Sequence, residues 1–199
     1  MIYKEKLMPP KIKITKEDII NTALDILRKD GEEAINARSI AAVLGCSTQP
    51  IFSNFASMED LLKATRVAAY DIYLASLERE ANSGKYPQYK AFGMAYIRFA
   101  SEEKQLFKLL FMCDRTINTH APNDDFDASV RMIMEANGVS FEKACLMHLE
   151  MWSFVHGIAT MFATSFLNLE WDLISDMLTD VYQGIRVRHL TGGNENGRN

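Results

Sequence analysis

The sequence predicts an all-α protein of about nine helices, and three observations support this fold class. Only 10 glycines and 5 prolines occur among the 199 residues, which favours long helices over a turn-rich β-fold. Hydrophobic residues make up 48% of the chain, enough for a substantial buried core. Apolar residues recur at helical spacing, whereas no segment shows sustained β-type alternation.

Helix-capping signals delimit four helices in the first part of the chain. Ser, Thr or Asn at a helix start accepts hydrogen bonds from first-turn amides, and Gly often follows the last turn. We therefore expect helices at 15–30, 36–45, 47–55 and 58 to about 81. The expected caps are Thr15, Asn36, Ser47 and Ser57, and Pro50 is tolerated in the first turn of the third helix.

Five further helices are expected after a break at 82–87. The fifth covers 89 to about 100, and the sixth is capped by Ser101 and ends near Met112. The seventh covers 126–136, the eighth is capped by Ser140 and extends to about Leu167, and the ninth covers 170 to about 188. Residues 113–124 are the most loop-like internal stretch, and residues 191–199 are expected to form a disordered tail.

Charge is distributed unevenly along the chain. The net charge of −4 divides into +1 for residues 1–66, with 10 basic and 9 acidic residues, and −5 for residues 67–199, with 12 and 17. Five of the first 16 residues are lysines, among them Lys11 and Lys13. A basic arm on an acidic body suits a protein that contacts phosphate with one end, and an ordinary solvated N-terminus explains the lysines equally well.

The sequence favours a cytoplasmic protein that contacts no membrane. The first 13 residues contain no apolar stretch of the kind that a signal peptide requires. Residues 151–169 lack Asp, Glu, Lys and Arg, but their several polar side chains favour a helix buried in protein over one in lipid. The widely spaced Cys46, Cys113 and Cys145 are expected to be reduced thiols, and Cys145 and His148 to mark one helical turn rather than a zinc site.

Catalytic motifs are not evident in the sequence. We find no glycine-rich phosphate loop, no nucleophile elbow and no paired metal motif. The four histidines, His120, His148, His156 and His189, lie in different sequence contexts. We therefore expect the protein not to be an enzyme and to need neither a metal nor another cofactor.

The segment 36–55 carries the pattern of a helix-turn-helix. Two short helices that meet at a sharp turn need a small residue at their crossing and a residue tolerant of positive φ in the turn. They also need an aliphatic residue of the second helix buried against the first. Ala41, Gly45 and Ile51 meet these needs at the intervals typical of a DNA-reading helix-turn-helix. All three residue types are common, so these positions by themselves are a weak signal.

A wider pattern surrounds these three residues. Residues 13–73 resemble the DNA-binding domain of TetR (tetracycline-repressor-like) regulators, which usually reads G-x-x-x-x-T-x-x-x-I-A-x-x-x-G-V-S-x-x-x-L-Y-x-H-F-x-x-K-x-x-L. The corresponding positions here are Gly31, Asn36, Ile40, Ala41, Gly45, Cys46, Ser47, Ile51, Phe52, Asn54, Phe55, Met58 and Leu61. The resemblance implies a ligand-binding and dimerisation domain at 74–190 and a ligand-responsive regulator of transcription, most commonly a repressor.

Three positions depart from residues that usually contact DNA phosphates in that family. Phe52 stands in place of Tyr and lacks its hydroxyl donor, and Met58 stands in place of Lys and lacks its charge. Asn54 stands in place of His and can still donate a hydrogen bond. We expect weaker backbone contacts, and hence a lower affinity and a flatter salt dependence.

Other residues are expected to supply the remaining DNA contacts. The candidates for phosphate contacts are Lys11, Lys13, Arg38, Lys63 and the helix starts at Asn36, Ser47 and Ser57. Base reading is assigned to Thr48, Gln49 and Ser53, because Gln suits adenine and Thr can touch a thymine methyl. The alternative is a regulator that acts mainly through protein partners and keeps a weakened DNA-binding head.

Aromatic and Met side chains concentrate in residues 74–190. The resemblance implies a ligand cavity among the fourth to eighth helices, and such side chains suit an adaptable, mostly apolar cavity. The candidates are Phe92, Tyr96, Phe99, Phe107, Phe111, Met112, Met134, Trp152, His156, Met161 and Phe162. For each of them, ordinary core packing is the competing interpretation.

The run from Trp152 to Gly157 resembles the W-x-x-x-H-G signature of one TetR subgroup in its eighth helix. Trp152 and His156 share a helix face, and Gly157 permits a close helix approach. His156 is expected either to orient a polar ligand group or to satisfy a buried carbonyl. A homodimer through the eighth and ninth helices would bury residues 151–169 and match two DNA half-sites. The family mechanism implies that effector binding moves the fourth helix and so releases DNA.

Overall fold

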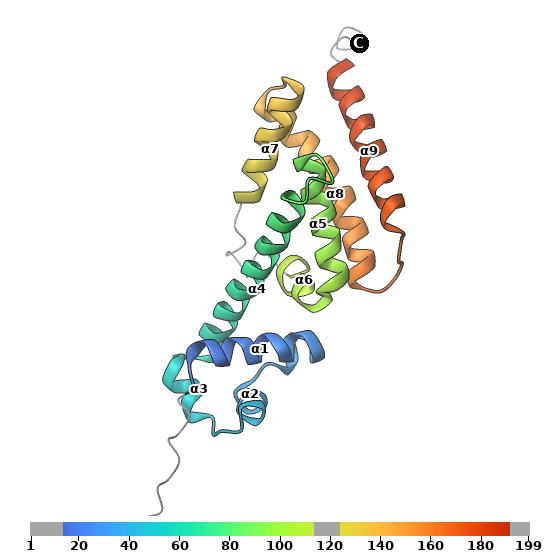
Figure 1. Ribbon diagram of the computed structural model, residues 1–199. Helices are drawn as coiled ribbons and strands as arrows, with labels where there is room; N and C mark the ends of the chain where they lie inside the picture. Colours follow the sequence, from blue (N-terminus) through green and yellow to red (C-terminus); the bar gives the residue numbers. More distant parts are fainter. Residues whose placement is uncertain (1–13, 114–123, 192–199) are drawn as a thin grey trace, which may run out of the picture. The chain divides into compact units, whose positions relative to one another are not determined.

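The computed structural model describes residues 14–113 and 124–191. Within these ranges the chain forms nine α-helices and one short 3-10 helix, with no β-strand, so the predicted all-α fold is confirmed (Figure 1). Contacts group the residues into two compact units, one up to Thr65 and one from Arg66 onward. Lys11, Lys13 and the predicted tail beyond Thr191 lie outside the described residues.

The first unit is a small helical domain built from short, locally capped helices. It contains α1 (Lys16–Asp30), a 3-10 helix (Glu32–Ala34), α2 (Ala37–Leu44), α3 (Gln49–Asn54) and the first turns of α4 (Met58–Ala81). Its core is mostly aliphatic: Leu27, Ile40 and Ile51 are at most 1% exposed. Burial of these side chains, one from each of the first three helices, holds α2 and α3 against α1.

Three of the four predicted caps in this unit are confirmed. The side chains of Thr15, Asn36 and Ser57 each accept a hydrogen bond from a first-turn amide. The prediction for Ser47 is wrong, because α3 begins at Gln49 and Thr48 occupies the N-cap position. Thr48 already has helical backbone angles, φ −73° and ψ −11°, and its side chain makes no capping hydrogen bond. A side-chain cap usually needs an extended backbone at this position.

The second unit comprises the rest of α4 and five further helices. These are α5 (Gln88–Glu102), α6 (Lys104–Phe111), α7 (Asp124–Asn137), α8 (Phe141–Ala163) and α9 (Trp171–Thr191). α5 packs against α6, α8 and α9, and α8 also lies against α7 and α9 (Figure 1). The division between the units falls inside α4, earlier than residue 73, because Arg66 and Tyr73 make contacts with later helices.

Two predicted helix ends in this unit are wrong. Ser101 does not cap α6 but lies inside α5, and Glu103 is the N-cap residue of α6. α8 ends at Ala163, well before Leu167, because Ser165 adopts a left-handed backbone conformation with φ 57°. The amide of Phe166 then donates to the carbonyl of Met161, a pattern that closes a helix. Thr191, expected in the disordered tail, is the last residue of α9.

Within one chain, the close crossing of helices lies at Gly93 and not at Gly157. A Cβ added at Gly157 would meet no atom of the described chain within 4 Å. A Cβ at Gly93 of α5 would lie 3.1 Å from Leu178 Cδ2 and 3.5 Å from Val155 Cγ2. Gly93 is therefore the position at which α5 approaches α8 and α9 closely. Among the described helices, none combines the length and apolarity needed to cross a membrane.

Candidate functional site

The turn between α2 and α3 has the geometry expected of a helix-turn-helix. Gly45 ends α2 in a left-handed conformation with φ 63°, which L-residues rarely adopt. Ala41 and Ile51, on the two sides of the turn, are 5% and 1% exposed. The amide of Cys46 donates to the carbonyl of Ala41 at 3.0 Å and tightens the turn. The three-residue pattern in the sequence therefore corresponds to a tight turn at Gly45 with a buried residue on the helix at each side.

The solvent-facing side of α3 presents Gln49, Phe52 and Ser53, which follow the i, i+3, i+4 spacing of one helix face. Ser53 Oγ donates to the carbonyl of Gln49 at 2.9 Å. Asn54 Nδ2 donates to the carbonyl of Pro50 at 2.8 Å, so one of the two N–H groups of this predicted phosphate donor is engaged within the helix. Phe52 is 52% exposed, which is high for a phenylalanine side chain.

The other predicted phosphate-contacting residues differ in their surroundings. Asn36 Oδ1 accepts from the amides of Arg38 and Ser39, and Asn36 Nδ2 donates to the carbonyl of Ala34. Arg38 is exposed, as is Ser47. Lys63 pairs with Glu59 on the same helix, Nζ to Oε1 2.8 Å, and this hydrogen bond raises the pKa of Lys63. Binding of a phosphate by Lys63 would therefore compete with Glu59.

Six of the predicted effector-binding residues come together as a cluster of rings in the second unit. The members, with two tyrosines of α4 that the sequence reasoning missed, are Tyr70, Tyr73, Tyr96, Phe99, Phe107, Phe111, Trp152 and His156. We call this set the ring cluster. Neighbouring ring centroids lie 4.9 to 6.5 Å apart, distances at which aromatic pairs attract one another. The ring cluster joins α4, α5, α6 and α8.

A tyrosine and a histidine form the polar centre of the ring cluster. The hydroxyl of Tyr96 lies 2.9 Å from Nδ1 of His156, and Trp152 stacks on the His156 ring with centroids 4.9 Å apart. Burial lowers the pKa of His156 below its ordinary value, so the imidazole is held neutral. A neutral imidazole bonded at Nδ1 keeps Nε2 for a second polar group. The hydrogen bond thus ties His156 to a side chain rather than to a buried carbonyl.

The remaining predicted effector-binding residues lie apart from these rings. Met134 packs against the buried residues Val130, Ile133, Ala144 and Met147. Phe162 stacks on Trp171, and Met112 is 41% exposed. Phe92 and Met161 are half-buried. Tyr70 and Tyr73 were detectable as two aromatics on one long helix, but their distance in sequence from the other rings concealed the contact.

A second group of polar and aromatic side chains joins α5, α7, α8 and α9. The hydroxyl of Tyr89 lies 3.0 Å from Nδ1 of His148, and Asn137 Nδ2 donates to the hydroxyl of Tyr182 at 3.0 Å. Arg186 Nε donates to Asn137 Oδ1 at 2.7 Å. Burial lowers the pKa of His148 and raises that of Tyr89. Cys145, three residues before His148, packs against a core cluster, so each member of the C-x-x-H pair has a structural partner.

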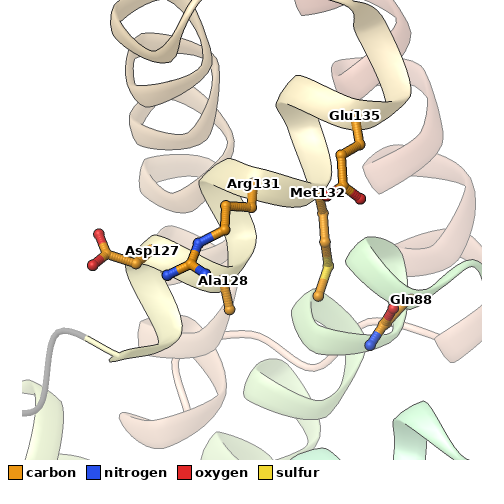
Figure 2. A pocket seen from close by; sticks show the side chains of 6 residues that line it. All are labelled: Gln88, Asp127, Ala128, Arg131, Met132 and Glu135. Carbon is orange, nitrogen blue, oxygen red and sulfur yellow. The ribbon is translucent and has the colours of Figure 1, made fainter.

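An open hollow lies on the surface between α7 and the start of α5 (Figure 2). It has a volume of about 480 Å³ and is lined by Gln88, Asp127, Ala128, Arg131, Met132 and Glu135. In Figure 2 the carboxylates of Asp127 and Glu135 point away from each other, with Arg131 and Met132 between them. None of the predicted effector-binding residues lines this hollow. Its charged rim differs from the uncharged ring cluster.

Exposed and half-exposed residues form a stripe along each of the last two helices. On α8 and its C-cap residue the stripe consists of Leu146, Leu149, Ser153, Gly157, Thr160 and Thr164, and on α9 of Leu173, Met177, Asp180, Gly184, Val187 and Thr191. Gly157, Thr160 and Met177 are half-exposed and the others are exposed. We call these the α8 stripe and the α9 stripe. Each repeats every three or four residues and so occupies one helix face. Leu146, Leu149, Leu173 and Val187 are 48 to 59% exposed.

Comparisons with known proteins agree with this architecture. Residues 89–181 match the family model of the tetracyclin repressor-like C-terminal domain. An uncharacterized HTH-type transcriptional regulator of Mycobacterium tuberculosis is 24% identical over 187 residues, which is 91% of this chain and 86% of the relative.

Solved structures with the same fold include two from Rhodococcus sp. RHA1. One, a protein of unknown function, has a TM-score of 0.70 with 22% identity and covers 88% of this chain and 97% of its own. The other, a TetR-like transcriptional regulator, has a TM-score of 0.61 with 15% identity, over 93% of this chain and 99% of its own. The chain thus shares its fold with a TetR-like transcriptional regulator, and residues 89–181 are similar to the tetracyclin repressor-like C-terminal domain.

Proposed function

We propose that the protein is a homodimeric repressor that binds operator DNA through α3 and is released by a small, mostly apolar effector. The observation that carries the DNA-binding part is the solvent-facing side of α3. The residues that hold the turn, Ala41 and Ile51, are buried, whereas Gln49, Phe52 and Ser53 face solvent and are free of the core. A recognition helix needs this separation between scaffold and reading face.

The ring cluster is the proposed effector site. None of its members carries a formal charge, since burial keeps His156 neutral. Aromatic walls suit apolar or aromatic molecules, and Nε2 of His156 offers one polar contact that would orient them. Because Tyr70 and Tyr73 of α4 belong to the ring cluster, an effector that separates the rings would act directly on α4. We infer that this displacement weakens DNA binding, and that DNA in turn weakens effector binding.

The α8 stripe and the α9 stripe are the proposed dimer surface. The two helices contact each other, and each exposes aliphatic side chains beside small residues such as Ser153, Gly157 and Gly184. Gly157 has open space around it within one chain, which leaves room for a partner helix. Burial of exposed Leu and Val side chains would drive association, and a two-fold dimer presents two reading helices to two half-sites.

A regulator that works mainly through protein partners is the second candidate. Two observations favour it: Asn54 uses one of its two amide N–H groups for the carbonyl of Pro50, and Lys63 forms an exposed ion pair with Glu59. Together with Phe52 and Met58, which lack a donor and a charge, they reduce the phosphate contacts that the head can offer.

Selection from a random double-stranded DNA library by the purified full-length chain separates the two candidates. A DNA-binding repressor is expected to enrich one sequence, related by two-fold symmetry, and to bind it about 10³-fold or more tightly than random DNA. Gln49→Ala should change the enriched bases, with Gln88→Ala, an exposed glutamine outside the head, as the matched control. Absence of any enriched sequence would favour the protein-partner candidate. An equal loss of affinity for enriched and random DNA in Gln49→Ala would make Gln49 a backbone contact.

A further inference from the structure

Phe52 is the largest apolar side chain on the solvent-facing side of α3. Its 52% exposure contrasts with Ile51 and Phe55, its near neighbours, which are 1% and 4% exposed. Single exposed hydrophobic residues are common on protein surfaces and need no explanation by themselves. The position of Phe52 on the same face as Gln49 and Ser53 is what makes its exposure informative.

The two polar side chains that follow Phe52 each make a hydrogen bond inside α3. Ser53 Oγ donates to the carbonyl of Gln49, and Asn54 Nδ2 donates to the carbonyl of Pro50. This leaves Gln49 and Phe52, three residues apart on one face, as the side chains that project most freely from the helix. One is a bidentate hydrogen-bonding group and the other a rigid apolar ring.

Phe52 has no donor for a phosphate, so contact with the DNA backbone would gain it little. The major groove offers one apolar feature to an apolar side chain, the C5-methyl group of thymine, and Phe is among the residues that contact it. The same base pair presents adenine N6 and N7 to a glutamine amide. A Gln–Phe pair on one helix face therefore matches A·T pairs in two chemically different ways.

We propose that Phe52 is a specificity-determining residue that selects thymine through its C5-methyl group, next to an adenine read by Gln49. This inference rests on the proposed DNA-binding function. Phe52 then adds sequence selectivity at a position where it cannot add a phosphate contact. The apolar contact in the major groove partly offsets the affinity lost through the missing phosphate contact. Because this apolar contact releases no counterions, its contribution to affinity does not depend on salt.

Deoxyuridine substitution tests this assignment, because it removes only the methyl group of thymine. In the duplex enriched by selection, each thymine is replaced in turn, and the affinity of the full-length chain is measured by fluorescence anisotropy. For the wild-type chain we expect one or two positions per half-site at which deoxyuridine weakens binding about fourfold, as burial of one methyl group predicts. In Phe52→Ala the same positions should become indifferent to the methyl group.

Two further variants complete the experiment. Val43→Ala removes another exposed apolar side chain of the head, 65% exposed on α2, and should retain the full effect of deoxyuridine. Phe52→Tyr keeps the ring and should retain the effect as well. Thermal melts by circular dichroism should show that Phe52→Ala folds normally, as expected for a half-exposed side chain.

The outcomes distinguish the inference from the function on which it rests. If no sequence is enriched, the proposed DNA-binding function fails. If a sequence is enriched but no thymine responds to deoxyuridine, the assignment of Phe52 is overturned while DNA binding stands. If wild type and Phe52→Ala respond equally, the methyl group is read by another residue, such as Thr48, and the assignment is again overturned.

Discussion

Burial controls the protonation of two histidines, His148 and His156, each of which has a tyrosine hydroxyl at its Nδ1. Burial lowers the pKa of both below 6.5. The unfolded chain therefore takes up protons near pH 6.5, whereas the folded chain does so only at lower pH. Between the lowered pKa values and about 6.5 the unfolded state binds more protons. The contribution of these two histidines to stability therefore falls as the pH decreases through this window and is level above it.

Removal of both imidazoles should reduce this acid sensitivity. We expect the melting temperature of the wild-type chain to drop between about pH 7.5 and about pH 5, and the drop to be smaller in His148→Gln/His156→Gln. Each unit by which a pKa is lowered corresponds to at most about 1.4 kcal/mol, and less where the ring is half-exposed. Differential scanning calorimetry at the two pH values measures the effect. An equal drop in both proteins would assign the acid sensitivity to carboxylates instead.

Among the helices, the contact at Gly93 makes a quantitative prediction. An alanine in a helix interior is normally favoured over glycine by about 1 kcal/mol. At Gly93 the new Cβ would lie 3.1 Å from Leu178 Cδ2, which is 1% exposed and has little room to move. We expect Gly93→Ala to destabilise the chain by about 1 kcal/mol through overpacking.

The same substitution should become favourable once the obstructing methyl group is gone. In a Leu178→Val background, where Cδ2 is absent, Gly93→Ala is expected to be neutral or stabilising. Urea unfolding of the four proteins gives the coupling between the two sites, expected at about 0.5 to 3 kcal/mol. Equal changes in both backgrounds would show that the close approach of α5 and α9 is not what constrains Gly93.

The predictable helix boundaries were those fixed by local hydrogen bonds. Thr15, Asn36 and Ser57 cap helices through amides two or three residues away, so their short sequence patterns contain the whole interaction. Ser101 and the end of α8 were wrong for the opposite reason. Ser101 satisfies a capping pattern but lies inside α5. α8 ends just before Ser165, which adopts a left-handed backbone conformation, although the apolar pattern of the sequence continues beyond it. Tertiary packing decides such positions, and a single sequence does not display it.

For the whole molecule, dimerisation provides a test with a matched control. Val187 in the α9 stripe and Val67 on α4 are both 59% exposed valines in helices. Val187→Asp would bury an unpaired charge in the proposed interface, a cost of several kcal/mol, whereas Val67→Asp would leave its charge in water. Analytical ultracentrifugation should show a dimer for wild type and Val67→Asp and a monomer for Val187→Asp. A monomeric wild type, or equal behaviour of the two variants, would contradict the proposed interface.

The fold of the whole molecule was more predictable than its site. Two patterns sufficed for the fold: helical spacing of apolar residues and the interval from Ala41 to Ile51. The ring cluster was foreseen only in part, because it depends on contacts such as that between Tyr96 and His156, 60 residues apart. The neighbours of Asn54 and Lys63 were also hidden, since a residue type indicates what a side chain can bind and not what already occupies it.

The local capping of the first unit has a consequence for how the chain folds. Its helices start and stop through hydrogen bonds between residues at most five positions apart, so little chain entropy is lost in forming them. The second unit depends on pairs such as Tyr89 and His148, 59 residues apart, and Lys90 and Thr179, 89 residues apart. Low contact order favours rapid folding. During synthesis, the head is therefore expected to fold while the helices that complete the second unit are still being made.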